Sequence, residues 1–474
     1  MIPELRVHLI GISGTGLSAI ARVLLERGCQ VSGSDLLLNA QASQLQAAGA
    51  RILIGHRAEN IQGADVVVRS SAVSDDNVEV MAAQAAGIPV LKRSEFLAQL
   101  IADQDSIAIA GSHGKTTTTA MLTWVLVALG LDPSYIIGGV SANLNTNAHA
   151  GQGQYFVIEA DEYDRMFLGL HPSLAVVTNI EHDHPDCFPT PEDFYQVFVS
   201  FAEQVQPQGM VLIGVDDAGG RRLYREMQAK GKQVFSYGVH ANNFQPLDYQ
   251  AVNLRAGESG GLAFDVLCTL SNGFTMRPAL SLQVPGEHNV ANALATLAVV
   301  HQLGLPVSQA TQALAAYQGT ARRFELRGEA NGVVIVDDYA HHPTQIQITL
   351  AAARQRFPGR RLWAVWQPHT YSRTRTLAAE FAQSFGLADQ VVVTQIYASR
   401  EAQPSDGFNA SSVVDAMQHA GKYFIPELKT AAQWLVEKLQ PGDVLLVFSA
   451  GDADQISAYV LAALQKLEES HVRD

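Results

Sequence analysis

The sequence predicts an α/β protein of three domains: a Rossmann-like N-terminal domain, a central P-loop ATPase-like domain and a C-terminal Rossmann-like α/β domain. Two observations carry this prediction. The 474 residues exceed what a single hydrophobic core organises. Apolar runs of strand length also alternate with helical patterns along the whole chain, which favours parallel sheets covered by helices. We place the domains at 1–102, 103–320 and 321–474 and expect a parallel sheet in each.

The first hundred residues open with a nucleotide-type βαβ unit. The strand Arg6–Ile10 is followed by a Gly-rich turn over 11–16, a helix over Leu17–Glu26 and a second strand that ends at Asp35. Ser13 stands where a strict G-x-G-x-x-G pattern has its second glycine. Taken alone, this segment is compatible with an NAD-dependent oxidoreductase.

The central segment contains a stronger motif for binding phosphate. An apolar strand over Ile107–Ile109 leads into Gly-Ser-His-Gly-Lys-Thr-Thr, and a helical pattern starts near Thr117. Backbone N–H groups and the helix dipole then point at an anion, Lys115 can reach the β- and γ-phosphates, and the Thr116 hydroxyl can hold Mg²⁺. Ile109 occupies the place of the first glycine of the usual pattern, so this is a shortened P-loop. It predicts binding of a nucleoside triphosphate.

Acidic and imidazole side chains follow the next two strands of this segment. Glu159, at the end of the strand Tyr155–Ile158, is a candidate Mg²⁺ ligand because it lies beside the P-loop. For Glu162 and Asp164 we expect a solvated acidic loop instead.

The strand Leu174–Thr178 leads into Glu181-His182-Asp183-His184. The two histidines and Asp183 resemble a Zn²⁺ ligand set, but a phosphate site usually uses Mg²⁺. His184 is therefore either a metal ligand or a hydrogen-bond donor to phosphate, and His182 is expected to be structural.

The last segment alternates again, and polar clusters lie at the ends of its strands. The predicted elements are Val333–Val336, Pro343–Arg356, Leu362–Trp366, Thr374–Phe385, Gln390–Thr394 and Val444–Phe448. The clusters are Asp337–Pro343 and Gln367–Arg375, at the edge where α/β sheets bind ligands. Arg373 can bind a carboxylate through paired N–H groups, whereas Arg375 fits a solvated helix start equally well.

Composition excludes several classes of protein. A net charge of −14 without a basic field argues against nucleic acid. The three cysteines are too scattered for a disulfide framework or a C-x-x-C metal site, and they fit a reducing cytoplasm. No apolar stretch reaches the ~20 residues that a membrane span needs. We expect a cytoplasmic protein without a signal segment or membrane insertion, as a monomer or weak homodimer.

Taken together, these segments resemble the Mur ligase family, the ATP-dependent enzymes that build the peptide stem of bacterial cell-wall precursors. The resemblance covers essentially the whole chain and includes the Gly-rich turn, the P-loop, Glu-Ala-Asp-Glu, Gly286-Glu287-His288-Asn289-x-x-Asn292, Arg322-Arg323-Phe324 and Asp338-Tyr339-Ala340-His341. The clusters Asp337–Pro343 and Gln367–His369 are most similar to the member that joins L-alanine to UDP-N-acetylmuramate through an acyl phosphate. Two alternatives stay open: a sister ligase that attaches a tripeptide to the same sugar in wall recycling, and a non-catalytic nucleotide-binding sensor.

The resemblance implies a role for each candidate residue. ATP would be bound by Gly111, Ser112, His113, Gly114, Lys115, Thr116, Thr117, His288, Asn289, Asn292, Arg322, Arg323 and Asp338. Mg²⁺, with Mn²⁺ as an alternative ion, would be held by Thr116, Glu159 and His184. The UDP-sugar would be bound by Ser13, Gly14, Thr15, Gly16, Asp35, Ser70, Ser71, Arg93 and His113. The amino acid would meet Tyr339, His341, His369 and Arg373, and the catalytic residues would be Lys115, His341, His369 and Arg373, with His341 or His369 deprotonating the amine.

The chain departs from the family pattern at two places. Thr370 stands where many members have an arginine after Gln-Pro-His, so Arg373 alone would supply that carboxylate contact. Several sister ligases use a carbamoylated lysine for a second Mg²⁺, but residues 185–206 contain no lysine.

Overall fold

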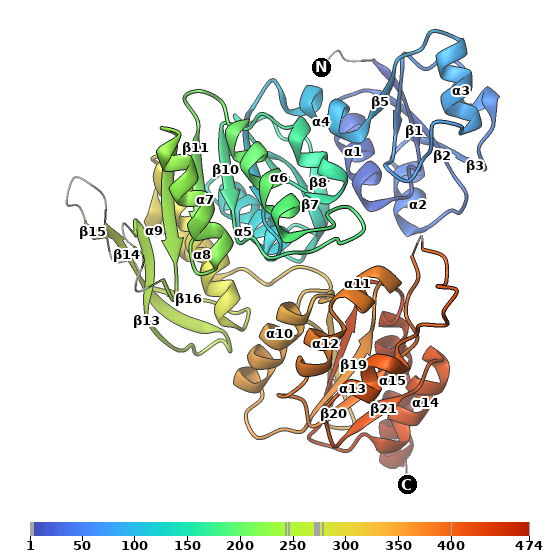
Figure 1. Cartoon of the computed structure of the whole chain (residues 1–474), viewed down its shortest axis with the longest axis vertical. Coiled ribbons are helices and arrows are strands. Elements are labelled where there is room, and N and C mark those ends of the chain that lie inside the picture. The colour runs from blue at the N-terminus through green and yellow to red at the C-terminus, as the bar shows by residue number, and fades with distance from the viewer. Residues whose placement is uncertain are drawn as a thin grey trace.

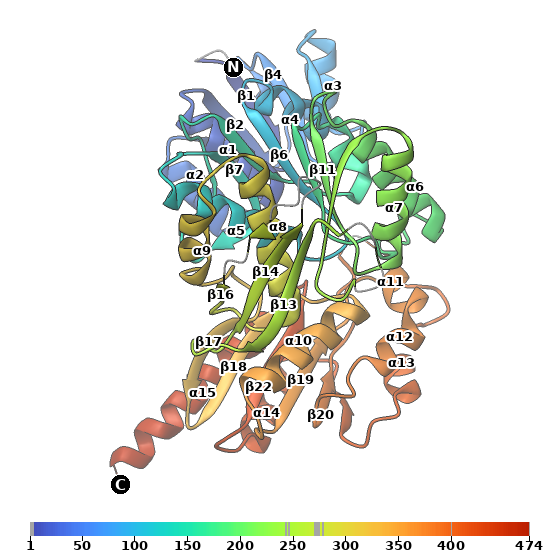
Figure 2. The same ribbon diagram turned by 90° about the vertical axis from the view of Figure 1, so that its left-hand side faces the viewer.

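The computed structural model describes residues 4–473 except 242–243, 245–246, 270–274, 277–278 and 400. Three blocks, each built around its own sheet, follow one another along the chain (Figure 1). Seen from the side, the central block lies between the N-terminal block above and the C-terminal block below (Figure 2). The predicted three-domain α/β fold is confirmed. Leu270 and the termini 1–3 and 474 therefore lie outside the described residues.

The N-terminal sheet has five parallel strands in the order β3-β2-β1-β4-β5. Its elements are β1 Arg6–Ile10, α1 Thr15–Glu26, β2 Gln30–Asp35, α2 Ala40–Ala47, β3 Arg51–Ile54, η1 Ala58–Ile61, β4 Val66–Arg69, α3 Val78–Ala85, β5 Val90–Lys92 and α4 Arg93–Ile101. Because β1 lies at the centre, the Gly-rich turn after it opens at the switch point of the strand order, where such sheets bind ligands.

The central sheet has a parallel middle in the order β13-β12-β11-β10-β6-β9-β7 and antiparallel additions at both edges. Its strands are β6 Asp105–Ala110, β7 Ser134–Ser141, β8 Thr146–His149, β9 Tyr155–Glu159, β10 Leu174–Val177, β11 Met210–Gly214, β12 Gln233–Gly238, β13 Tyr249–Ala256, β14 Leu262–Thr269, β15 Thr275–Met276 and β16 Ala279–Ser281. Its helices are α5 Lys115–Ala128, η2 Tyr163–Gly169, α6 Pro191–Glu203, α7 Ala218–Ala229, α8 Glu287–Gln302 and α9 Val307–Ala315.

The predicted parallel sheet is confirmed for the middle of this domain, but the edges of the sheet are antiparallel. Strands β7 and β8 pair antiparallel, as do β13 and β14. The connections over 142–145 and 257–261 are too short for the crossover that parallel neighbours need, so each pair closes as a hairpin.

The C-terminal sheet is parallel except for its first strand, in the order β17-β18-β22-β19-β20-β21. Its elements are β17 Glu325–Ala330, β18 Val333–Asp338, α10 Pro343–Arg356, β19 Leu362–Gln367, α11 Tyr371–Thr376, α12 Ala378–Gln383, β20 Gln390–Val393, α13 Ser411–Ala416, β21 Lys422–Phe424, α14 Leu428–Lys438, β22 Val444–Ser449 and α15 Asp454–Arg473. Two features of this domain differ from the prediction. The antiparallel β17 was not foreseen, and the helix expected over 374–385 is two short helices, because Leu377 leaves helical geometry at φ −107° and ψ 23°.

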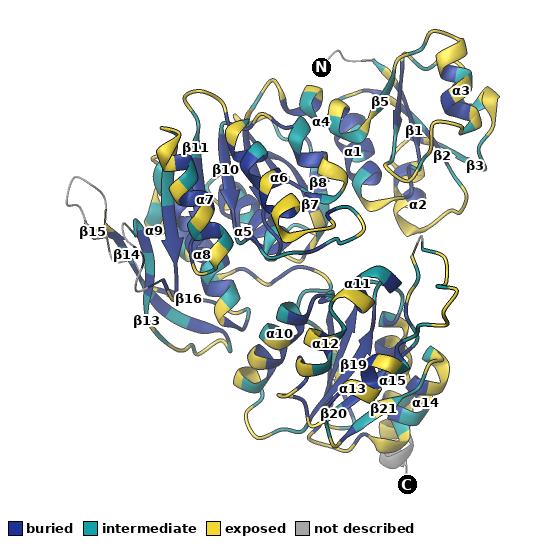
Figure 3. Ribbon diagram, viewed as in Figure 1, coloured by how far each residue is buried: buried dark blue, intermediate teal, exposed yellow. Residues whose placement is uncertain are grey.

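The buried residues lie mainly in the strands of the sheets and on one side of the helices that cover them (Figure 3). One apolar core runs from the N-terminal domain into the central domain, since α1 and α4 pack against β8 and η2. The C-terminal domain has apolar cores of its own among the described residues. Among all the residues that the structure describes, no helix is both long enough and apolar enough to cross a bilayer.

Candidate active site

The phosphate loop connects β6 to α5 and needs its two glycines. Gly111 has φ +135°, and a Cβ there would lie 2.0 Å from Thr178 Oγ1. Gly114 has φ +83°, and a Cβ there would lie 2.6 Å from Asn292 Oδ1. Both positions combine left-handed backbone with a close neighbour, so only glycine fits without strain. The start of α5 is thereby left open to an anion.

Lys115, at the first position of α5, is paired with a buried carboxylate. Its Nζ lies 2.9 Å from Glu162 Oε1 and 2.8 Å from Oε2, and it donates to the Gly111 carbonyl at 2.5 Å. Burial alone would lower the pKa of Lys115, but Glu162 and then Asp161 outweigh it, so the pKa is raised and the side chain stays charged.

The prediction of a solvated loop was wrong for Glu162, whose side chain is 1% exposed. The chain turns into η2 directly after β9, and this turn folds Glu162 back against Lys115. Asp164 is exposed, as expected.

Thr116 and Glu159 form an oxygen-donor pair beside this loop. The Thr116 hydroxyl donates to Glu159 Oε1 at 3.0 Å, and the Gly138 N–H donates to Oε2 at 2.7 Å. Burial raises the pKa of Glu159, and nearby Lys115 opposes that shift. A hydroxyl and a carboxylate are hard oxygen ligands, so this donor set fits Mg²⁺.

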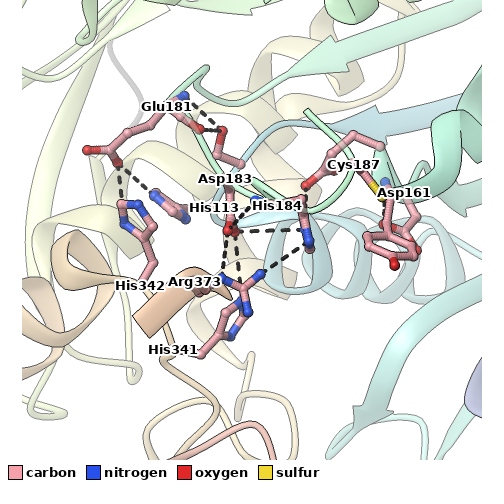
Figure 4. Close-up of polar contacts among 12 residues, drawn as sticks. His113, Asp161, Glu181, Asp183, His184, Cys187, His341, His342 and Arg373 are labelled. Carbon is pink, nitrogen blue, oxygen red and sulfur yellow. Dashed lines mark hydrogen bonds and ion pairs between the residues drawn. The ribbon is translucent and has the colours of Figure 1, made fainter. Parts of the chain in front are cut away.

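His184 belongs to a buried network that crosses from the central to the C-terminal domain (Figure 4). Arg373 Nε donates to Asp183 Oδ1 at 2.8 Å, and another of its nitrogens lies 3.2 Å from His184 Nδ1. His184 Nε2 lies 3.6 Å from Glu162 Oε1. The Asp183 and Arg373 side chains are 2% and 4% exposed. Burial would raise the pKa of Asp183, but Arg373 and the neighbouring histidines hold it well below its usual range.

The residues Glu181–His184 do not form one zinc site, because their side chains have separate partners. His182 Nε2 contacts the Phe188 carbonyl at 2.8 Å and its ring packs on Phe194, so it is structural, as expected. A different set, His113, Glu181 and His342, brings ligand-type atoms within 4.8 Å of one another. One of these nitrogens already has a partner, since His342 Nδ1 accepts from the Thr344 N–H in the first turn of α10.

The two histidines of the predicted amino-acid site lie side by side, with ring centroids 6.2 Å apart. His341 Nδ1 lies 2.9 Å from the Tyr339 carbonyl and its Nε2 lies 3.9 Å from Asp183 Oδ2. Burial, and then Arg373, hold the pKa of His341 well below its usual value, so its ring is neutral. His369 Nδ1 faces Arg373 at 3.2 Å and its ring stacks on Tyr397.

The two arginines at the start of the C-terminal domain differ in their contacts. Arg322 donates to the carbonyls of Ser449 and Gly451, at 2.7 and 3.0 Å. Both guanidinium groups lie over the Tyr339 ring, 5.0 and 5.1 Å from its centroid, and both line the cavity described below, but only Arg322 is also held by these two carbonyls among the described contacts. Asp338 accepts from the Phe324 and Ala340 amides, so it shapes this segment.

Three predicted residues of α8 lie behind the phosphate loop. Asn292 Oδ1 accepts from Thr118 in α5 at 3.1 Å, and Asn292 donates to Asn289. His288 is partly buried, its Nδ1 atom is buried without a hydrogen-bond partner, and burial lowers its pKa to about 4.

In the N-terminal domain Arg93 lies over the Gly-rich turn. Its nearest guanidinium nitrogen would be 2.1 Å from a Cβ at Gly16, and it pairs with Asp161 of the central domain at 3.3 Å. Asp35 accepts from the Ser13 N–H at 2.9 Å and so holds the turn. Ser70 lies beside Gly11 of that turn, whereas Ser71 is exposed.

A cavity of about 710 Å³ joins these groups from all three domains. The predicted residues that line it are Thr15, Gly16, Arg93, Ser112, His113, Gly114, Lys115, Thr116, Glu159, His184, Arg322, Arg323, Tyr339, His341, His369 and Arg373. The predicted residues outside its lining are Ser13, Gly14, Asp35, Ser70, Ser71, Gly111, Thr117, His288, Asn289, Asn292 and Asp338.

Sequence reasoning missed four residues with central places in the site: Glu162, Glu181, Asp183 and Gln345. The first three lie in the acidic segments after β9 and β10, so their positions were visible but their partners were not. Gln345 gave no signal, because a glutamine in the first turn of a helix is ordinary.

The Mur ligase family catalytic domain matches residues 6–105, the Mur ligase middle domain matches 109–300, and the Mur ligase glutamate ligase domain matches 322–451. The chain belongs to the Mur ligase family. UDP-N-acetylmuramate–L-alanine ligase of Saccharopolyspora erythraea is 43% identical over 469 residues, which cover 97% of this chain and 94% of the relative.

Solved Mur ligase structures share the whole architecture. The UDP-N-acetylmuramate–alanine ligase of Thermotoga maritima has a TM-score of 0.81 at 27% identity and covers 98% of this chain and 100% of its own. A murein peptide ligase of Psychrobacter arcticus has a TM-score of 0.71 at 27% identity, covering 97% and 99%. The chain is therefore a Mur ligase over nearly its full length.

Proposed function

We propose that this chain joins L-alanine to the carboxylate of UDP-N-acetylmuramate, with cleavage of ATP to ADP and phosphate. The observation that carries the proposal is the shared cavity. It is lined by the phosphate loop of the central domain, by Arg93 of the N-terminal domain, and by His341 and Arg373 of the C-terminal domain. The identity of 43% to a ligase of that name supports the choice of substrates. We also propose a cytoplasmic monomer or weak homodimer as the working form.

The chemistry starts from a carboxylate that is too unreactive to acylate an amine directly. The substrate carboxylate oxygen attacks the γ-phosphorus of ATP, and the bond from that phosphorus to the ADP oxygen breaks. Lys115 and Arg323, which both line the cavity, neutralise charge on the transferring phosphoryl group. The product is an acyl phosphate and ADP.

The amino group of L-alanine then attacks the acyl carbon, and phosphate leaves from the tetrahedral intermediate. The ammonium form must first lose a proton, and the two histidines differ in their readiness to accept it. His341 Nδ1 donates to the Tyr339 carbonyl and so carries the ring proton, which leaves the lone pair of Nε2 free. His369 Nδ1 already accepts from Arg373. We therefore assign the base to His341.

Mg²⁺ would be held by the Thr116 hydroxyl and the Glu159 carboxylate, with His184 from the neighbouring strand end, and when bound it supplies positive charge to the phosphate oxygens. Arg373 has one buried carboxylate partner and two imidazole contacts. We propose that it retains a site for the amino-acid carboxylate at the edge of that network, with Thr370 at the start of α11 beside it.

The test is phosphate release by the full chain with ATP, Mg²⁺ and UDP-N-acetylmuramate against a panel of L-alanine, glycine, L-serine and the wall tripeptide. We expect the highest kcat/KM with L-alanine. A higher value with the tripeptide would assign the wall-recycling reaction instead. ADP binding without turnover on any acceptor would favour the sensor.

A further inference from the structure

A second connection between the C-terminal domain and the nucleotide site runs through His113 of the phosphate loop (Figure 4). His113 Nε2 lies 2.7 Å from Glu181 Oε2 in the central domain. Its Nδ1 lies 2.8 Å from Gln345 Nε2, in the first turn of α10. Both ring nitrogens are therefore occupied, one by each domain.

The orientation of the Gln345 amide decides where the His113 proton lies. The His341 N–H donates to Gln345 Oε1 at 2.9 Å, so the amide NH₂ group must face His113. That NH₂ group donates to Nδ1. Nε2 consequently carries the ring proton and donates it to Glu181. One chain of hydrogen bonds thus runs from the backbone of His341, in the amino-acid site, to the phosphate loop.

Glu181 ties the same two domains a second time. Its Oε1 accepts from the Thr344 hydroxyl of α10 at 2.7 Å, while its backbone N–H and carbonyl both bond to the Ser112 hydroxyl of the phosphate loop, at 2.8 and 2.7 Å. Burial would raise the pKa of Glu181, but His113 and Thr344 hold it at about 2, so the carboxylate is ionised. The first turn of α10 is therefore linked to the phosphate loop in two ways: Thr344 through the ionised Glu181, and Gln345 directly through His113.

We propose that Gln345 is a positioning residue that couples docking of the amino-acid domain to the shape of the phosphate loop. This inference rests on the proposed function. In the docked arrangement His113 connects Gln345 to Glu181, and so transmits docking of the C-terminal domain to the phosphate loop. A loop fixed only when α10 is docked prevents phosphoryl transfer before the amino-acid site is assembled. Premature transfer would expose the acyl phosphate to water.

Gln345→Leu tests the coupling, with Gln347→Leu on the exposed face of α10 as the matched control. We expect kcat of Gln345→Leu to fall about tenfold or more, because the loop is misplaced in the closed state. The Kd for ADP, measured by calorimetry without the other substrates, should stay within twofold, because nucleotide first binds before α10 docks. A parallel loss in both quantities, or a kcat equal to that of Gln347→Leu, would overturn the proposal.

Gln345→Glu supplies a second readout that a structural role would not move. Its carboxylate can still accept from the His341 N–H, but it places a second carboxylate against His113, where Glu181 and His342 already face the ring. The ring must then be doubly protonated to keep both contacts. We expect kcat of Gln345→Glu to be near that of the parent at pH 6 and to fall about tenfold by pH 9. A pH profile of kcat parallel to that of the parent would contradict the proposed connection through His113. Absence of turnover by the parent enzyme itself would contradict the proposed function and not the coupling between α10 docking and the phosphate loop.

Discussion

At the scale of single residues, the site depends on charges that are buried in pairs. Lys115 and Glu162 share one such pair at the start of α5, and each would be costly to bury alone. Asp183 and Arg373 form another. Removing one partner therefore changes stability as well as chemistry, and a double variant is needed to separate the two effects.

Lys115→Met should lower kcat by about a hundredfold or more, because the variant lacks the cation that neutralises the transferring phosphate. It should also lower the melting temperature, since Glu162 loses its nearest cation. Lys115→Met combined with Glu162→Gln should regain much of the melting temperature while kcat stays low. Recovery of turnover in the double variant would show that Lys115 acts only as a structural ion-pair partner.

Asp337 gives a pH dependence of stability. Burial raises its pKa to about 6, with Ser457 and Arg327 opposing the shift. The native state therefore holds a proton more tightly than the unfolded chain, so this contribution to stability falls as pH rises from about 4 to about 6, by up to about 3 kcal/mol. Asp337→Asn should raise the melting temperature at pH 8 and leave it nearly unchanged at pH 4. Equal effects at both pH values would contradict the assignment.

At the scale of elements, the site depends on how closely strands and helix starts approach. In β7, Gly138 lies against Glu159 at the end of β9, and a Cβ there would come within 2.5 Å of Glu159 Oε2. No other residue type leaves room for the carboxylate to reach Thr116. The close approach of β7 to β9 thus determines where the oxygen-donor pair lies.

Gly138→Ala should displace the Glu159 carboxylate and raise the Mg²⁺ concentration that gives half-maximal activity by about tenfold. Gly386→Ala is the control, since a Cβ there meets nothing within 4 Å. The measurement is a magnesium titration of phosphate release with each variant. An unchanged titration curve for Gly138→Ala would remove Glu159 from the metal site.

At the scale of the whole molecule, the two domain interfaces are held by different forces. The N-terminal and central domains share an apolar core. The contacts of the C-terminal domain with the phosphate-loop side are polar, through Asp183–Arg373, Glu181–Thr344 and His113–Gln345. Polar contacts lose less on separation because water replaces them, so we expect the C-terminal domain to be the one that moves.

Asp183→Asn should shift the ligand-free enzyme toward open forms, because the buried Arg373 loses its carboxylate at a cost of about 3–5 kcal/mol in the docked arrangement. Small-angle X-ray scattering should then give a larger radius of gyration than for the parent. Arg375→Gln, which breaks the exposed pair with Asp406, is the control and should leave the curve unchanged. Scattering curves of Asp183→Asn and the parent that superimpose would refute this role.

The sequence alone determined those parts of the protein that depend on neighbours along the chain. The P-loop, the Gly-rich first turn and the acids after β9 and β10 are local patterns, because a strand, a turn and a helix start are formed by consecutive residues. The alternation of strands and helices gave the three-domain fold for the same reason. The antiparallel edge strands were not predicted because a short apolar run contains no information about the direction of the strand that pairs with it.

Only the tertiary structure decided which charges are buried and with whom. Arg373 and Asp183 are 190 residues apart in sequence, and Gln345 and His113 are 232 apart. From the sequence Glu162 is expected to be a solvated acid, but in the structure the turn into η2 places its carboxylate against Lys115. Burial and pairing of a side chain are set by segments remote in sequence, and these contacts bring three separate phosphate- and carboxylate-binding patterns together around one shared cavity.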